Sequence, residues 1–64
     1  MFKKHMMVYA NQKINNKINA GCAGTIVYVF SDNMFEVEFF DEKMNIMDLV
    51  SISGNQIVNK SKLQ

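Results

Sequence analysis

The sequence predicts a small all-β protein: a five-stranded antiparallel barrel of the SH3-like type, formed by one domain over residues 1–64. Short runs rich in β-branched and aromatic residues recur along the chain, and turn-forming residues separate them. No segment has the length and periodicity of a substantial helix. A three-stranded meander would leave one face of the most apolar run, "TIVYVF", uncovered, whereas a small and strongly bent barrel covers both faces.

The predicted strands follow from the residue pattern of each run. The clearest is "MFEVEFF", in which apolar residues alternate with Glu36 and Glu38, so that one face is apolar and the other acidic. "TIVYVF" is expected to be buried on much of both faces, and "IMDLVSI" alternates less cleanly. The five predicted strands are residues 6–9, 25–30, 34–40, 46–52 and 57–58.

Turn chemistry separates these strands. "SDN" at 31–33 and "DEKMN" at 41–45 are predicted turns, with Asn45 expected in the left-handed conformation. Residues 53–56 are expected to turn again as one 3₁₀ turn. Gly21 and Gly24 lie just before a strand, which indicates a tight turn with positive φ or a close approach of two backbones.

Two segments are not predicted to be regular. Residues 11–19 contain four asparagines, which are poor interior helix residues, so we expect an irregular arm pinned to the core by Ile14 and Ile18. Residues 59–64 are expected to fray.

Composition narrows the cellular setting and the type of function. A domain of this size buries only about 60% of the surface exposed by its unfolded chain, and works more often through surfaces than through enclosed pockets. A single cysteine, Cys22, cannot form an internal disulfide, which favours a reducing compartment. No run has the length of a signal-peptide core or of a membrane span, so we expect a soluble, cytoplasmic protein.

Catalysis, metal binding and cofactor binding are not expected. Nucleophilic catalysis would need Cys22 or a serine beside a base, and the only histidine is His5, near the amino terminus. One histidine and one cysteine do not make a recognised metal-ligand spacing. Glu36 and Glu38 on an exposed strand face would lack the raised pKa that a general acid needs.

The chain also resembles a small bacterial domain family of unknown function. The pattern is a glycine pair leading into G-T-I-V, then a Y/F-E-V-E-F strand and a Leu/Val-rich strand. The matching stretches are "GCAGTIV" at 21–27, "FEVEF" at 35–39 and "DLVSI" at 48–52. The resemblance implies an SH3-like barrel. Members often occur beside toxin genes, and the likeness extends to immunity proteins of contact-dependent growth inhibition, which implies an immunity protein or antitoxin.

Charge distribution gives a second indication of function. Residues 1–31 contain four lysines and no acid, whereas residues 32–48 contain all six acids and one lysine. A negative surface on a rigid barrel suits a basic partner, such as a nuclease toxin with a cationic groove. The partner-binding residues expected are Glu36, Glu38, Asp41, Glu42 and Asp48 as the acidic surface, with Met34, Phe40 and Tyr28 as apolar anchors.

Two alternatives remain open at the level of sequence. A small RNA-binding barrel would use a basic patch formed by Lys3, Lys4, Lys13 and Lys17, although arginine is absent and the clearest strand face is negative. A non-catalytic accessory domain of an enzyme complex is the other. In each case we expect a monomer or a weak homodimer, because an exposed edge strand can pair two barrels.

Overall fold

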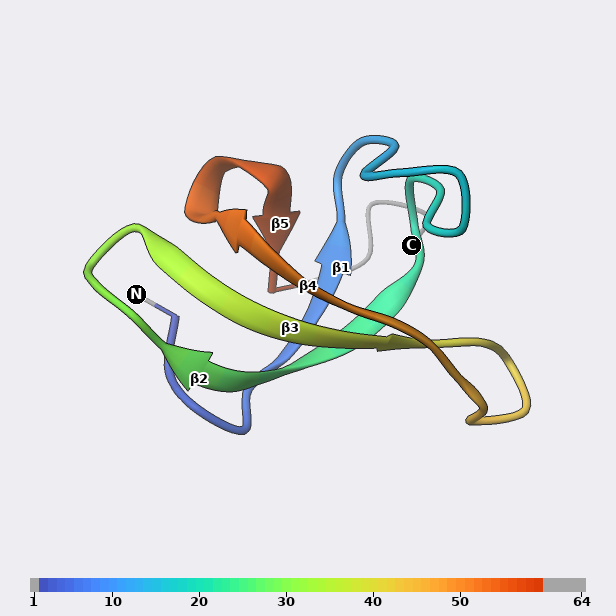
Figure 1. The fold of residues 1–64 in the computed structure, drawn as a ribbon, viewed down its shortest axis with the longest axis horizontal. Coiled ribbons are helices and arrows are strands. Elements are labelled where there is room, and N and C mark those ends of the chain that lie inside the picture. Colours follow the sequence, from blue (N-terminus) through green and yellow to red (C-terminus); the bar gives the residue numbers. More distant parts are fainter. Residues whose placement is uncertain (1, 60–64) are drawn as a thin grey trace.

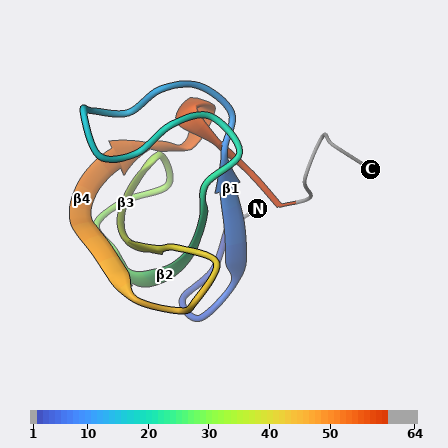
Figure 2. The same ribbon diagram turned by 90° about the vertical axis from the view of Figure 1, so that its right-hand side faces the viewer.

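The computed structural model describes residues 2–59, which form one antiparallel sheet. The sheet has five strands in the order β4–β3–β2–β1–β5 and is strongly bent (Figure 1). Turned by 90°, it curls around its inner face as a small SH3-like barrel, which is the predicted fold class (Figure 2). The elements are β1 (Met7–Ala10), β2 (Ala23–Val29), β3 (Met34–Phe40), β4 (Ile46–Ser53), the 3₁₀ turn η1 (Gly54–Gln56) and β5 (Ile57–Val58).

Strand boundaries agree closely with the sequence pattern. The predictions for β3 and β5 are confirmed, and β1 and β4 differ from their predicted ranges by one residue. β2 begins two residues earlier than predicted, because Ala23 and Gly24 already pair with β1 and β3. The 3₁₀ turn is confirmed within 53–56. The expected frayed tail lies, from residue 60 onward, outside the described residues.

The core fills the inner face of the curled sheet. The alternation in β3 places Phe35, Val37 and Phe39 inward, each at most 1% exposed. The irregular arm contributes Ile18, which is fully buried, and Ile14, which packs against the core, so the predicted pinning is confirmed. The buried core consists of Val8, Ala10, Ile18, Ile26, Phe35, Val37, Phe39, Ile52 and Ile57.

An asparagine turn positions Ile18 in the arm. The side-chain oxygen of Asn15 accepts the backbone N–H groups of Lys17 (2.8 Å) and Ile18 (3.0 Å), which is the local bonding that favours asparagine in turns. Gly21, at φ 90°, then returns the chain, and its N–H donates to Ala10 O at 2.7 Å. The tight turn expected at this glycine is therefore confirmed.

Gly24 serves the second purpose expected of the glycines, a close approach. It lies between Val8 of β1 and Phe39 of β3 in the sheet register. A Cβ atom at this position would lie 2.8 Å from Val37 Cγ1 and 2.9 Å from Phe39 Cδ1, closer than carbon atoms pack. The buried Phe39 ring therefore occupies the volume that a side chain on residue 24 would need.

The β3–β4 turn corrects one expectation. The left-handed residue is Met44, with φ 69°, and not Asn45 as the sequence analysis expected. Asn45 instead donates its backbone N–H to Asp41 Oδ1 at 2.9 Å, and its side-chain amide faces Asp41 Oδ2 at 3.4 Å. The hydrogen bonds of Asn45 thus close the turn, and the preceding methionine takes the strained conformation.

Replacing Gly24 by alanine should destabilise the barrel. The added methyl group must displace Val37 or Phe39 in a filled core, which costs about 1–3 kcal/mol. Urea unfolding should show a lower midpoint with an unchanged slope. Gly54→Ala is the matched control. The Cβ atom added there would have the Asn33 side chain, at 3.0 Å, as its nearest neighbour, so the loss of stability should be smaller. Equal losses in the two variants would contradict this reading.

Replacing Met44 by glycine should stabilise the protein. The left-handed conformation costs an L-residue roughly 1–2 kcal/mol, and the greater freedom of glycine in the unfolded chain offsets part of that, leaving a gain of about 0.5–1 kcal/mol. Met44 is 68% exposed, so little packing is lost. Thermal unfolding would measure the gain. Asn45→Gly, which removes the side-chain contact with Asp41 and does not relieve Met44, should give none.

Candidate binding surface

The outer face of β2, β3 and β4 brings Glu36 and Glu38 together, as the alternation in β3 predicts. Sheet register places Tyr28, Glu36 and Ser51 in one row across the three strands, and Thr25, Glu38 and Leu49 in the next. Residues directly opposite each other in a sheet point to the same side, so both glutamates lie opposite the core. We call this side of β2–β4, with the adjoining Phe30, the outer face.

Large apolar side chains surround these two glutamates. On the outer face, Tyr28 is 52% exposed, Phe30 53%, Ile46 63% and Leu49 50%. Glu36 and Glu38 are themselves half-buried. A contiguous apolar area around polar groups is the usual composition of a protein-binding surface, because such an area gains most from being covered.

The two predicted anchors in β3 lie at its ends. Met34 begins the strand, is 38% exposed and pairs with Ser53. Phe40 ends the strand, is half-buried and pairs with Ala23 and Ile46. Both occupy outer-face positions, so the structure joins them to the same surface as Glu36 and Glu38.

A bulge in β2 brings Tyr28 to this surface. The register of β2 against β3 shifts between Ile26 and Tyr28, leaving Val27 as the extra residue. Ile26 is fully buried, and Tyr28 then points outward beside Glu36. Phe30 was not among the residues that the sequence analysis selected, because a β-branched and aromatic run without polar interruptions does not reveal where a bulge changes the facing.

Asp41 has a structural role in the turn. Its Oδ1 accepts the N–H of Lys43 at 2.8 Å and that of Asn45 at 2.9 Å. The hydrogen bond from the Asn45 backbone lowers the pKa of Asp41, with smaller contributions from Lys43 and the Asn45 side chain, against an opposing effect of desolvation. A carboxylate that already accepts several donors has less capacity to bind a partner.

Asp48 lies on the other side of the sheet from the glutamates. It is opposite the buried Phe39, and therefore shares the inner side of β4. Its Oδ2 accepts from Asn15 Nδ2 at 2.9 Å and its Oδ1 from the N–H of Leu49 at 3.0 Å. Asp48 thus joins the arm to β4.

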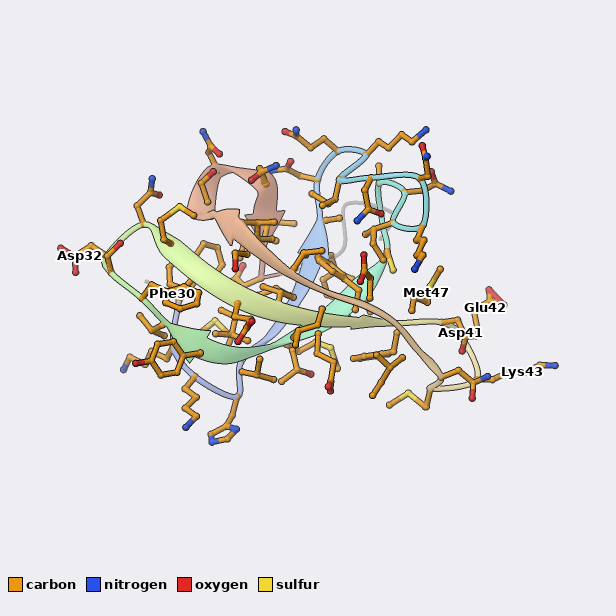
Figure 3. All side chains as sticks on the ribbon, in the orientation of Figure 1. Phe30, Asp32, Asp41, Glu42, Lys43 and Met47 are labelled. Atoms are coloured by element: carbon orange, nitrogen blue, oxygen red, sulfur yellow. The ribbon has the colours of Figure 1, made fainter. Side chains whose placement is uncertain are left out.

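The remaining acids lie at opposite ends of the sheet. Asp32 is in the β2–β3 turn, near Phe30, whereas Glu42 lies beside Asp41 in the β3–β4 turn (Figure 3). The six carboxylates therefore follow the length of β3 and do not form one compact cluster. Only Glu36 and Glu38 share the centre of the outer face.

An open groove of about 740 Å³ lies between the end of the arm and the β3–β4 turn. Its lining contains both Lys17 and Lys43 and both Asp41 and Glu42, so it has no single charge sign. Cys22 also lines it, with Sγ 3.9 Å from Met47 Sδ. The groove therefore lacks the single sign of charge that Glu36 and Glu38 give to the outer face.

Within residues 2–59, the structure brings no base next to the Cys22 thiol, whose neighbours are Ala23 O, Phe40 O and Met47 Sδ. Burial raises the pKa of the Cys22 thiol, and the charge of Asp41 raises it further, so the thiolate is disfavoured. His5 lies beside the middle of β2, where its backbone N–H donates to Ile26 O at 2.7 Å. Cys22 packs against the core, which is how a free cysteine usually behaves, as a small apolar residue.

Neither a metal-binding cluster nor a membrane-spanning helix is found among the described residues. Within residues 2–59, no three His, Cys, Asp or Glu side chains converge in a group that would hold a metal ion. Over the same range, no helix has the length and hydropathy needed to span a bilayer.

The lysines proposed for a basic patch are divided between two ends of the molecule. Lys3 and Lys4 precede β1, whereas Lys13 and Lys17 belong to the arm that follows it. Figure 1 shows these two segments on opposite sides of the bent sheet. The structure therefore does not join these four lysines into one surface.

The acid stability of the protein should depend on Asp41. Because its folded-state pKa lies below the ordinary 3.8, its contribution to stability is present above that pH and is lost as the pH falls through the folded-state pKa. Urea unfolding from pH 5 to pH 2 should show a steeper loss in the wild type than in Asp41→Asn, which keeps an acceptor but does not titrate. Glu42→Gln should retain the wild-type slope, and a wild-type slope in Asp41→Asn would contradict the assignment.

Comparison with known proteins identifies the family. No curated protein and no solved structure gives a significant match to the chain. Residues 8–59 match the family described as Domain of unknown function (DUF4926), and this range runs from β1 through β5. Since the match covers most of the 64 residues, the protein belongs to the DUF4926 family.

Proposed function

We propose that the protein is a non-catalytic binding protein whose outer face docks onto a basic partner protein. The observation that carries the proposal is the pair Glu36 and Glu38, half-buried at the centre of a surface with four large exposed apolar side chains. Apolar area supplies most of the binding free energy at such a surface, whereas carboxylates select the sign of the partner and speed its approach.

Burial on docking makes the charge of the partner important. Glu36 and Glu38 are only partly solvated in the free protein, and a covering partner would remove more water from them. A carboxylate left without a partner in an interface is costly, so a neutral or acidic surface would bind poorly. A surface with arginine or lysine opposite the two glutamates would satisfy them.

A nuclease toxin is the partner class that we favour, and the protein would then be a bacterial immunity protein or antitoxin acting in the cytoplasm. Nucleases hold phosphates with cationic grooves, which an acidic and apolar barrel face can cover. The resemblance of "GCAGTIV" and "FEVEF" to domains encoded beside toxin genes supports this class. Because Asp41 and Asp48 are engaged in internal hydrogen bonds, the proposed electrostatic contact is centred on Glu36 and Glu38.

RNA binding is the alternative that one observation favours. Tyr28 and Phe30 are exposed aromatic side chains, and such side chains stack on unpaired bases. The neighbouring glutamates would repel the phosphates, however, and the lysines are divided between two ends of the molecule. A gel-shift series with single-stranded RNA separates the two functions, because only the RNA-binding barrel gives a salt-dependent shift.

Charge reversal at the outer face should weaken partner binding. We would capture the partner from extracts of the native host on the immobilised full chain, identify it, and measure its affinity and nuclease activity with purified protein. Replacing both Glu36 and Glu38 by lysine should reduce the affinity roughly tenfold or more, lower its salt dependence and release the nuclease activity.

The matched control is Asp32→Lys with Glu42→Lys, which makes the same change of net charge at the two ends of the sheet. It should retain most of the affinity, because these acids lie away from the centre of the outer face. The proposal fails if the two double variants bind the partner equally well, or if the captured protein keeps its full activity when bound.

A further inference from the structure

Two exposed aromatic rings lie together at one end of the outer face. The rings of Tyr28 and Phe30 are in edge-to-face contact, with centroids 4.9 Å apart and an interplanar angle of 60°. Each side chain is about half exposed, at 52% and 53%. The two rings thus form a ledge on which a flat group can stack.

The fold does not require aromatic residues at these positions. Phe35 closes this end of the core from β3, with the Phe2 ring against it at 5.6 Å. The backbone N–H of Phe30 donates to Met34 O at 2.9 Å, a bond that any residue except proline would make. Exposed aromatic area that the core does not use is characteristic of recognition sites.

Glu36 lies next to this ledge. It is directly opposite Tyr28 in the register of β2 and β3, which separates their Cβ atoms by about 4.5–5.5 Å. Glu36 is half-buried, and its position in the register borders the aromatic area. A carboxylate beside two ring faces favours a cation, through charge and through the negative face of each ring.

We infer that Tyr28, Phe30 and Glu36 form a binding site for the guanidinium group of an arginine side chain. This inference rests on the proposed function, and it names the group of the basic partner that anchors the interface. Guanidinium is planar and stacks on aromatic rings while its N–H groups bond a carboxylate in a two-point contact. A lysine ammonium group, compact and more strongly hydrated, would use the carboxylate but gain less from the rings.

A nucleobase is the competing occupant of the same rings. Glu36 argues against it, because the phosphate attached to a stacked base would approach a carboxylate. Lys3 and Lys4 nevertheless belong to the amino-terminal segment, which hydrogen-bonds to Ile26 of β2, two residues before Tyr28, through His5 and Met6. The experiment therefore includes an oligonucleotide.

The test is a titration of the full chain, and two-dimensional NMR spectra of the backbone amides are recorded at each step. The probes are the N-acetyl, N′-methylamide derivatives of arginine, lysine and citrulline, the last having the shape of arginine without its charge. The arginine derivative should perturb the amides around Tyr28, Phe30 and Glu36. Its affinity should be several-fold higher than that of the lysine derivative, and it should exceed the affinity of the citrulline derivative by a larger factor. Equal binding of citrulline, or shifts that spread evenly over the sheet, would overturn the inference.

Three variants locate the site. Tyr28→Ala and Glu36→Gln should each weaken arginine binding several-fold, whereas Glu38→Gln, an equivalent change two residues along the same strand, should leave it nearly unchanged. All three positions face outward, and the dispersion of each spectrum reports whether the fold is kept. Equal effects of Glu36→Gln and Glu38→Gln would show a general charge effect and overturn the assignment.

Two further results separate this inference from the proposed function. If oligouridylate perturbs the same amides more strongly than arginine, the ledge is a base-stacking site and the inference is wrong. If arginine does not bind but the partner still depends on Glu36 and Glu38, only the inference fails. Arginine binding at the ledge without any dependence of a partner on the two glutamates would support the inference and reject the proposed function.

Discussion

The curl of the sheet depends on the absence of a side chain at residue 24. Gly24 lies in the row that joins Val8 to Phe39, where a Cβ atom would come within 2.9 Å of the Phe39 ring. With that volume free, Val37 and Phe39 pack over residue 24, and the inward side chains of β3 share one buried cluster with Ile26 and with Ile18 of the arm. The barrel thus encloses an all-apolar core with few residues, because the glycine leaves room for the Phe39 ring.

Most of the fold follows from local pattern, and the exceptions have identifiable physical causes. The strict alternation in β3 fixes which residues face the core, since a slip of one position would bury Glu36 and Glu38. The facing of Tyr28 could not be predicted in the same way, because the bulge at Val27 depends on how β2 fits β3. Met44 was not predicted to be left-handed because Asn45 is the better residue for that conformation, and the hydrogen bonds to Asp41 override this preference.

The sequence locates the centre of the candidate site but not its limits. Glu36 and Glu38 are assigned by alternation alone, whereas Asp48 is close to them in sequence yet lies on the inner side of β4, bonded to Asn15. The number of acidic residues in a segment therefore overestimates its acidic surface, because some of the carboxylates are engaged in hydrogen bonds to turns and loops. The sequence underestimates the number of aromatic side chains on the surface. A run such as "TIVYVF" is typical of a buried strand, and only the three-dimensional register shows that its end is exposed.

The bonding of the edge strand favours docking through the outer face over strand addition. β4 is an edge of the sheet, and an edge strand offers unpaired amide groups to any extended segment that approaches. In this protein the Leu49 N–H donates to Asp48 Oδ1, and the Ser53 N–H donates to Gln56 Oε1 at 2.9 Å. A strand added at this edge would have to displace both side chains and leave their oxygens without donors. The outer face involves no such loss, because its contacts would be made by side chains that the fold leaves uncovered. Asp48, although turned away from the outer face, therefore makes strand addition at the β4 edge less favourable.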